Sequence, residues 1–344
     1  MSEKRKLRWL IAHYPKHLFQ RTADAFTQEL NQLLPDQFEV EVHTADTYVK
    51  QYGKLNNLLL KRANLPGLEE ELSAEDNIGA SSDTSTKWNT LFDGLRDGDI
   101  EITQTQVHIA GELLDSGYQA LDLPYLFNDH DHVSRVLDGA IGDALCVDHS
   151  EKTGIRGLAF TYSGGYRVIG SNKSITNLSA LVDTNLVTGS TPSWVLFREL
   201  GITNTFNLGD VSDLGESVNL EAVETTYIRF SGKNVLRTNH SMFLTTILTG
   251  NKFWNTLTPE QQDAFKIATK KVAKLERQWS IDDAAEYEQK AVDNGVTIVD
   301  LSAEDTASLK KVAQKSYIHM NDIGVDRKLV ASIIKEGRGT ITVH

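Results

Sequence analysis

Apolar and polar residues are arranged in three distinct ways over the first forty positions. Residues 7–12 form a short apolar run, which is typical of a buried strand. Apolar residues then recur at helical spacing from Leu18 to Leu33, and residues 38–42 alternate between apolar and polar side chains. Strand, helix and strand in this order predict a βαβ unit and a parallel sheet, so we expect an α/β protein.

Residues 53–87 interrupt this pattern. They contain Pro66 and Gly67, an acidic cluster at residues 69–71 and a run of mostly small and polar residues at 79–86. Such a composition is typical of a surface segment. We interpret residues 53–87 as an inserted, partly helical surface segment.

The rest of the chain continues to alternate between strands and helices. Helices are predicted over residues 88–98 and 133–141, around Trp194 and Phe197, and after a cap at Ser302. The predicted strands share short apolar or alternating composition, and they cover residues 100–102, 155–160, 185–187, 220–227, 235–240, 244–248 and 296–299. The α/β pattern therefore covers most of the chain.

One predicted helix is much longer than the others. Thr258 is suited to cap it, Pro259 to occupy its first position and Gln261 to complete a capping box. No residue breaks the pattern before about Asn294, so the helix has about 35 residues and a length of about 50 Å. Because this exceeds one small domain, we expect the helix to run along two.

Composition and charge limit the classes of function. The chain has 344 residues and a net charge of -12, so two domains are possible and a nucleic-acid-binding surface, which needs a basic face, is disfavoured. No apolar run approaches the roughly 18 residues of a membrane span, and residues 7–12 are too few for the core of a signal peptide. We expect no direct membrane insertion, and either a cytoplasmic protein or one whose signal peptide was removed.

The sequence contains no recognisable catalytic motif. It has no nucleophile elbow, no phosphate-binding glycine loop and no dinucleotide fingerprint, and Cys146 lies in an apolar context typical of an inert buried thiol. The polar run from Asp129 to His132 precedes a helix and suits a cap better than a metal site, whose ligands converge from spaced positions. We expect a protein that is not an enzyme and that uses no cofactor and no metal.

Arg167 is the most informative candidate for ligand binding. It follows the predicted strand at residues 155–160 and the pair Gly164 and Gly165, which permits a tight backbone bend. An arginine fork is suited to a carboxylate in a cleft. An exposed arginine after a turn is the alternative interpretation.

Six motifs, in the correct order, resemble those of the extracytoplasmic substrate-binding proteins of tripartite ATP-independent periplasmic (TRAP) transporters. They are LRDGDIEITQ at residues 95–104, LDLPYLF at 121–127, LDGAIG at 137–142, GYR at 165–167, TNH at 238–240 and FWNTLTPEQ at 253–261. The resemblance extends from residue 7 to about residue 323, and residues 53–87 are its least similar part.

This resemblance implies a two-domain α/β fold of the periplasmic-binding-protein type (type II-like), with crossing hinge strands and a long helix that spans both domains. We expect residues 1–160, 241–257 and 295–344 in the first domain, 161–240 in the second and 258–294 along both. The family implies a small organic acid that binds between domains which close over it, delivery to the membrane subunits of a TRAP transporter, and a periplasmic location. A sensor module of the same fold and an enzyme built on it remain alternatives.

Two departures from the family pattern bear on the ligand. Arg167 matches one of the family's two ligand arginines, but Val187 stands at the position of the other. The family's acidic motif corresponds to residues 220–226, which keep Glu224, a candidate partner that neutralises Arg167. We therefore expect a monocarboxylate, or a ligand whose acid is held by Arg167 together with neutral donors.

The remaining candidates are chosen by position. Open α/β sheets bind ligands at the ends of their strands, which selects some of these residues. Aromatic residues on strands or helices can form one wall of a ligand site, although they more often belong to the core. Residues two apart on a strand share a face, which groups the two glutamines. The candidate set is Arg167, His13, Tyr14, Gln104, Gln106, His108, Tyr162, Val187, Trp194, Glu224 and Thr225.

Overall fold

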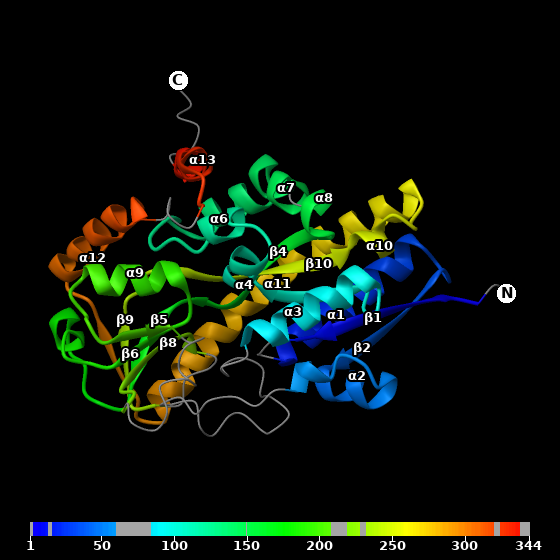
Figure 1. Ribbon diagram of the computed structural model, residues 1–344. Helices are drawn as coiled ribbons and strands as arrows, with labels where there is room; N and C mark the ends of the chain where they lie inside the picture. Colours follow the sequence, from blue (N-terminus) through cyan, green and yellow to red (C-terminus); the bar gives the residue numbers. More distant parts are fainter. Residues whose placement is uncertain are drawn as a thin grey trace.

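The computed structural model describes residues 3–12, 16–59, 84–148, 150–207, 219–227, 232–319 and 324–337. The candidates His13 and Tyr14, and residues 60–83 of the expected surface segment, lie outside these ranges. The described strands form two separate sheets, and the helices cover them in two lobes that lie side by side (Figure 1). We call them the first and the second lobe.

The first lobe is built on a five-stranded sheet with the order β2-β1-β3-β10-β4. Its strands are β1 (Arg5–Ile11), β2 (Phe38–Thr44), β3 (Ile102–Gln106), β4 (Ile155–Tyr166) and β10 (Met242–Gly250). β1 pairs in parallel with β2 and β3, which confirms the predicted βαβ unit, whereas β10 pairs antiparallel with β3 and β4.

Helices bury both faces of this sheet. One face packs on α1 (Lys16–Leu33), whose Phe19 and Phe26 lie in the same apolar cluster as Trp9 and Phe265. α10 (Asn251–Trp254) contributes Phe253 and Trp254 to this same cluster. The opposite face carries shorter helices, whose bounds are α2 (Ala45–Tyr52), η1 (Asn56–Leu59), α3 (Thr84–Asp97), α4 (Val107–Leu113), α5 (Gly117–Ala120), α6 (His130–Leu137), α7 (Ala140–Val147) and α8 (Ser150–Thr153). The predicted single helix over residues 133–141 is in fact the pair α6 and α7, separated at Gly139.

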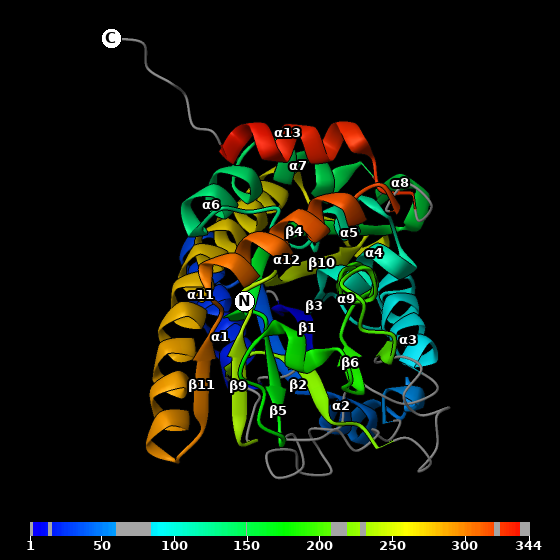
Figure 2. The ribbon, with the colours of Figure 1, turned by 90° about the vertical axis from the view of Figure 1, so that its left-hand side faces the viewer.

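The second lobe is built on a six-stranded sheet with the order β11-β9-β5-β8-β6-β7. Its strands are β5 (Val168–Ser171), β6 (Leu186–Thr188), β7 (Thr205–Asn207), β8 (Ala222–Thr225), β9 (Asn234–Arg237) and β11 (Thr297–Asp300). One face packs on η2 (Leu178–Leu181), α9 (Thr191–Glu199) and α12 (Ala303–Ser316). Figure 2 shows α12 above β5 and β9, and α9 above β6.

Two extended segments cross between the lobes. β4 leaves the first sheet and continues, after Arg167, as β5 of the second, while residues 238–241 connect β9 to β10. Gly164 and Gly165 have φ angles of 91° and 76°, a backbone region that favours glycine. They lie inside β4, where its pairing with β10 shifts register between Met242 and Leu244, so the backbone is irregular at the predicted glycines. The expectation that the strand ends near residue 160 is wrong: the strand continues to Tyr166 and carries Arg167 to the junction of the lobes.

The long helix α11 (Pro259–Asp293) also belongs to both lobes. It has 35 residues and begins with the predicted capping box, in which Thr258 accepts a hydrogen bond from the backbone of Gln261. Its first half packs on the first sheet through residues such as Phe265, and near its end Glu288 pairs with Arg237 of β9. Figures 1 and 2 show it running from α10 to the far end of the second lobe.

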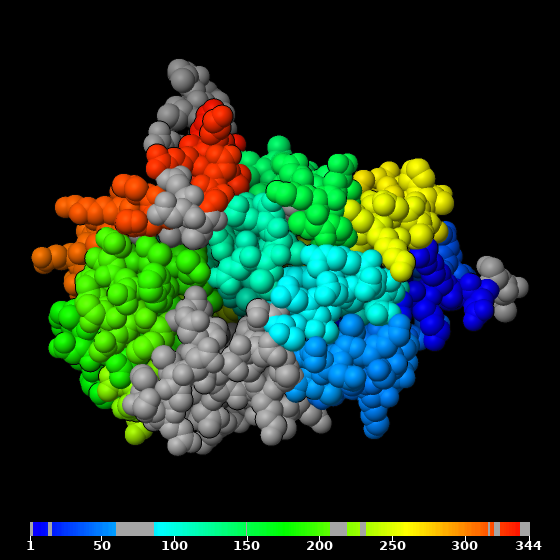
Figure 3. Space-filling view, in the orientation of Figure 1, coloured from blue at the N-terminus to red at the C-terminus, as the bar shows by residue number. Residues whose placement is uncertain are grey.

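The C-terminal region departs from the expected division of the chain. We expected residues 295–344 in the first domain, but β11 pairs with β9 in the second sheet and α12 packs on α9. The reason is that α11 ends in the second lobe, so the nearest sheet edge open to the next strand is that of β9. The last described helix, α13 (Arg327–Gly337), returns to α6 of the first lobe. Figure 3 shows the green and orange residues of the second lobe at the left of the molecule and the blue N-terminal residues at the right.

The backbone of α3 approaches β10 closely at Gly250. Gly250 ends β10 with an ordinary φ of -79°, but a Cβ there would overlap the carbonyl oxygen of Leu95 and lie 2.7 Å from its carbonyl carbon. We expect Gly250→Ala to lower the free energy of unfolding by about 2 kcal/mol or more, because backbone atoms must move apart. Gly201→Ala is the control, since nothing lies within 4 Å of its Cβ position and only its φ of 99° opposes the change. Urea denaturation that gives equal losses for the two variants would contradict the role of this contact.

Candidate functional site

Arg167 is buried at the junction of the two lobes, with 2% of its surface exposed. Its Nη1 donates hydrogen bonds to Asp122 Oδ1 at 2.5 Å and to Ser241 Oγ at 3.0 Å, and its backbone N–H donates to the Ser241 carbonyl. The guanidinium carbon lies 4.6 Å from the centre of the Phe243 ring. The arginine is therefore fixed by the first lobe and by the crossing segment at residues 238–241.

Glu224 supplies the second carboxylate, from β8 of the second lobe. Its Oε1 accepts hydrogen bonds from Ser193 Oγ at 2.7 Å and His240 Nε2 at 2.8 Å, and its Oε2 accepts one from the Gly189 backbone at 2.5 Å. The Nε of Arg167 lies 3.6 Å from Glu224 Oε1, so the expected pairing of these two residues is present. We call Asp122, Arg167, Glu224 and His240 the junction cluster.

The two carboxylates of the junction cluster titrate in opposite directions. For Glu224, burial opposes the charged form, but Arg167 and His240 outweigh burial and lower its pKa to about 2. For Asp122, burial prevails over Arg167 and raises the pKa. Hydrogen bonding contributes to the difference, since Glu224 accepts three bonds besides its arginine, and the charge of Glu224 raises the pKa of Asp122 further. For Arg167 itself, burial opposes the charge, and the two carboxylates outweigh it and raise the pKa.

The guanidinium is held tightly on one edge and loosely on the other. Nη1 makes the two short bonds described above, whereas Nη2 lies 3.4 Å from His108 Nδ1 and Nε lies 3.6 Å from Glu224. Carboxylates commonly bind an arginine through two parallel N–H groups of its fork. The edge formed by Nε and Nη2 is therefore the one whose contacts are long enough to be replaced by shorter bonds to an anion.

Gln104 lies away from the junction cluster. Its Nε2 donates to Thr161 Oγ1 at 2.6 Å and lies 3.5 Å from Glu276 Oε1, on the side of the sheet that α11 covers. Glu276 is fully buried, and its Oε2 accepts a hydrogen bond from the Tyr162 backbone at 2.8 Å. Burial raises the pKa of Glu276 to about 8, although the bond from Tyr162 and the charge of Arg277 act in the other direction. This carboxyl group is therefore neutral at pH 7.

Glu276 gives stability a defined pH dependence. Because the pKa of Glu276 is about 8 in the folded state and 4.5 ordinarily, the folded protein binds this proton more tightly. The contribution of Glu276 to stability is therefore largest below pH 4.5 and is lost as pH rises towards 8. We expect Glu276→Gln to become more stable relative to the parent by about 4 kcal/mol over that interval, because the slope approaches about 1.4 kcal/mol per pH unit only between the two pKa values. Asp282→Asn, at an exposed position of the same helix, is the control. Parallel stability profiles of Glu276→Gln and the parent in urea between pH 4.5 and 8 would exclude a neutral Glu276.

Three further candidates lie in packed surroundings. Tyr162 is 1% exposed and belongs to an apolar cluster of the first lobe, beside the ring of His130. Val187 is fully buried in a cluster with Val168 and other aliphatic residues of the second sheet. Trp194 donates its indole N–H to the Thr205 carbonyl at 3.0 Å. The structure does not bring these three side chains into contact with Arg167.

The remaining candidates, His108, Gln106 and Thr225, lie in different surroundings. His108 lies beside Arg167, as described above, and Gln106 is half-buried at the start of α4. Thr225 is buried next to Glu224 and its Oγ1 donates to the Thr226 carbonyl. In the run from Asp129 to His132, the Asp129 side chain caps α6 by accepting from the His132 backbone at 2.7 Å, as the sequence predicted.

Sequence reasoning missed Asp122, Ser193 and His240. Asp122 is an acid within the apolar motif LDLPYLF, and a buried acid among leucines indicates a cationic partner. His240 lies in the motif TNH at the end of a predicted strand, a position comparable to those used to select His13. Ser193 lies next to Trp194, and nothing in its local sequence distinguishes it.

Two α/β lobes joined by crossing strands and a shared helix define a two-domain solute-binding protein. Residues 82–205 and 219–322 match the profile of the DctP family, described as "Bacterial extracellular solute-binding protein, family 7", and the chain belongs to this family. The resemblance to the substrate-binding proteins of TRAP transporters is thereby confirmed, and with it the predicted fold class.

Three similar proteins illustrate the range of the family. The C4-dicarboxylate-binding periplasmic protein DctP of Vibrio cholerae is 23% identical and is matched over 83% of this chain and 86% of its own length. A TRAP solute-binding protein of Haemophilus influenzae with bound L-gulonate has a TM-score of 0.73, 18% identity and coverage of 97% of this chain and 99% of its own. The sugar acid binding protein DctPAm of Advenella mimigardefordensis, in complex with galactonate, has a TM-score of 0.74, 16% identity and coverage of 98% of each chain.

The helices also bear on membrane association. Over the part of the chain that the structure describes, none of them combines the length and the apolar character needed to cross a bilayer.

Proposed function

We propose that this protein binds a small organic acid with a single carboxylate between its lobes and delivers it to the membrane subunits of a TRAP-type transporter in the periplasm. The observation that carries the proposal is the loosely held Nε and Nη2 edge of Arg167 at the junction of the lobes. The organic acids bound by structurally similar proteins support the ligand class. The role is binding rather than catalysis, in keeping with the family.

The preference for one carboxylate rests on charge. Arg167 already faces two protein carboxylates, and Val187, at the position of the family's second arginine, is buried among aliphatic side chains. A second ligand carboxylate would enter without a matching arginine at that position and would face the charge of Glu224. The cost of desolvating an unpaired charge disfavours it.

A comparison of ligands that differ by one carboxylate tests this preference. Galactonate and galactarate share a six-carbon polyol skeleton but carry one and two carboxylates. We expect galactonate to raise the melting temperature, since a ligand at 100 times its Kd stabilises the folded state by about 2.7 kcal/mol. Galactarate is expected to raise it less at the same concentration. A larger shift with galactarate or succinate would refute the preference for monocarboxylates.

Arg167 is expected to contribute directly to affinity. Arg167→Ala should weaken binding of an acid identified by that screen by about 2 kcal/mol or more, because the carboxylate loses its charged partner. Arg277→Ala is the matched control, since Arg277 is also buried but bonds to the Phe160 carbonyl and to Asp138 of the first lobe. Both variants should be less stable without ligand, and calorimetry should show weakened binding in Arg167→Ala alone. Equal affinities in the two variants would remove Arg167 from the site.

A further inference from the structure

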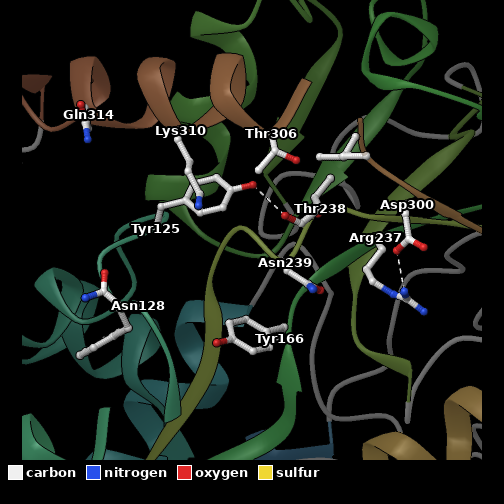
Figure 4. Close-up of a pocket in the computed structure, with 12 residues that line it drawn as sticks. Tyr125, Asn128, Tyr166, Arg237, Thr238, Asn239, Asp300, Thr306, Lys310 and Gln314 are labelled. Atoms are coloured by element: carbon white, nitrogen blue, oxygen red, sulfur yellow. Dashed lines mark hydrogen bonds and ion pairs between the residues drawn. The ribbon is translucent and has the colours of Figure 1, made fainter. Parts of the chain in front are cut away.

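A cavity, which we call the hinge pocket, lies beside the crossing segments. It has a volume of about 640 Å³, in the range of small-molecule sites, and residues of both lobes line it (Figure 4). Tyr125 comes from the first lobe, Tyr166 and Asn239 from the crossing segments, and Thr306 and Lys310 from α12 of the second lobe. A molecule bound here would touch both lobes at once.

The hinge pocket is separate from the junction cluster. On each crossing segment a residue that lines the pocket is followed directly by a residue of the cluster: Tyr166 by Arg167, and Asn239 by His240. Figure 4 shows the Tyr166 and Asn239 side chains facing the same cavity as Lys310. The two crossing segments therefore stand between the two sites.

The backbone around the hinge pocket is strained. Tyr125 and Asn239 have φ angles of 54° and 43°, which are unusual for residues other than glycine. The strain is maintained by two hydrogen bonds, from the Tyr125 backbone to the His240 carbonyl at 2.6 Å and from the Tyr125 hydroxyl to the Thr238 carbonyl at 2.7 Å. Backbone strain of this kind clusters at functional sites, where the surrounding structure enforces it.

The charges that line the hinge pocket favour an anion. Asp300 is the carboxylate among the lining residues, and it pairs at 2.5 Å with Arg237, which also bonds to Glu288. Lys310 is exposed, and its ammonium nitrogen lies 5.6 Å from the centre of the Tyr125 ring. Its charge is therefore not offset by the carboxylate that lines the cavity.

We propose that the hinge pocket is a second binding site, for a small anion that carries one carboxylate and several hydroxyl groups. The Lys310 ammonium group pairs with the carboxylate. The rings of Tyr125 and Tyr166 pack against the C–H groups of the ligand, and the Asn239 amide and Thr306 hydroxyl bond to its hydroxyl groups. Because both lobes contribute, occupancy of this pocket is coupled to the angle between them.

Gluconate is the probe for this proposal, and calorimetric titration of the full chain is the measurement. Lys310→Gln removes the cation, while Lys311→Gln, an exposed change at the next position of α12, is the matched control. We expect Lys310→Gln to raise the Kd of one gluconate-binding event about tenfold, because the variant loses one charge-assisted hydrogen bond. Lys311→Gln should bind gluconate as the parent does.

Arg167→Lys separates this site from the proposed cleft site. If Arg167→Lys retains gluconate binding and Lys310→Gln loses it, the result supports a site in the hinge pocket. This conclusion holds even if the cleft takes no gluconate and the proposed function fails. Titrations of Lys310→Gln and Lys311→Gln that superimpose would overturn the proposal. Loss of all gluconate binding in Arg167→Lys, or no binding to the parent, would overturn it as well.

Discussion

The arrangement of the two lobes depends on one buried cation, the guanidinium of Arg167. Asp122 approaches it from the first lobe and Glu224 from the second, so this single side chain pairs with one carboxylate of each lobe. A buried ion pair of this kind contributes little net stability, because desolvation offsets the attraction, but removing one partner typically costs about 3–5 kcal/mol. We infer that it acts against alternative arrangements of the crossing strands, because one charge would remain buried and unpaired in them.

The secondary structure could be predicted well where one physical signal dominates. The stripe of α1 and the capping box and length of α11 follow from periodicity and local hydrogen bonding, which depend on neighbouring residues alone. The location of β11 could not be predicted in this way. Its sequence fits an edge strand of either sheet, and the choice depends on where α11 ends in space.

The candidate site was predictable only in part, for a related reason. The sequence indicates Arg167 and Glu224, whose positions at strand ends and in family motifs carry information. Strand alternation places Gln104 and Gln106 on one face but does not say which face, and Gln104 points to Glu276 instead of Arg167. Asp122, Ser193 and His240 meet only in the folded chain, since they are contributed by separate elements of both lobes.

The continuity of α11 has a consequence for how the lobes can move. After Pro259 at its first position, the helix contains neither proline nor glycine, the residues at which helices most often kink sharply. A change in the angle between the lobes must therefore be spread over many turns as gentle curvature, or taken up by sliding of packed side chains along its surface. The helix therefore links the positions of the two lobes along its whole length and offers no single point at which they could hinge.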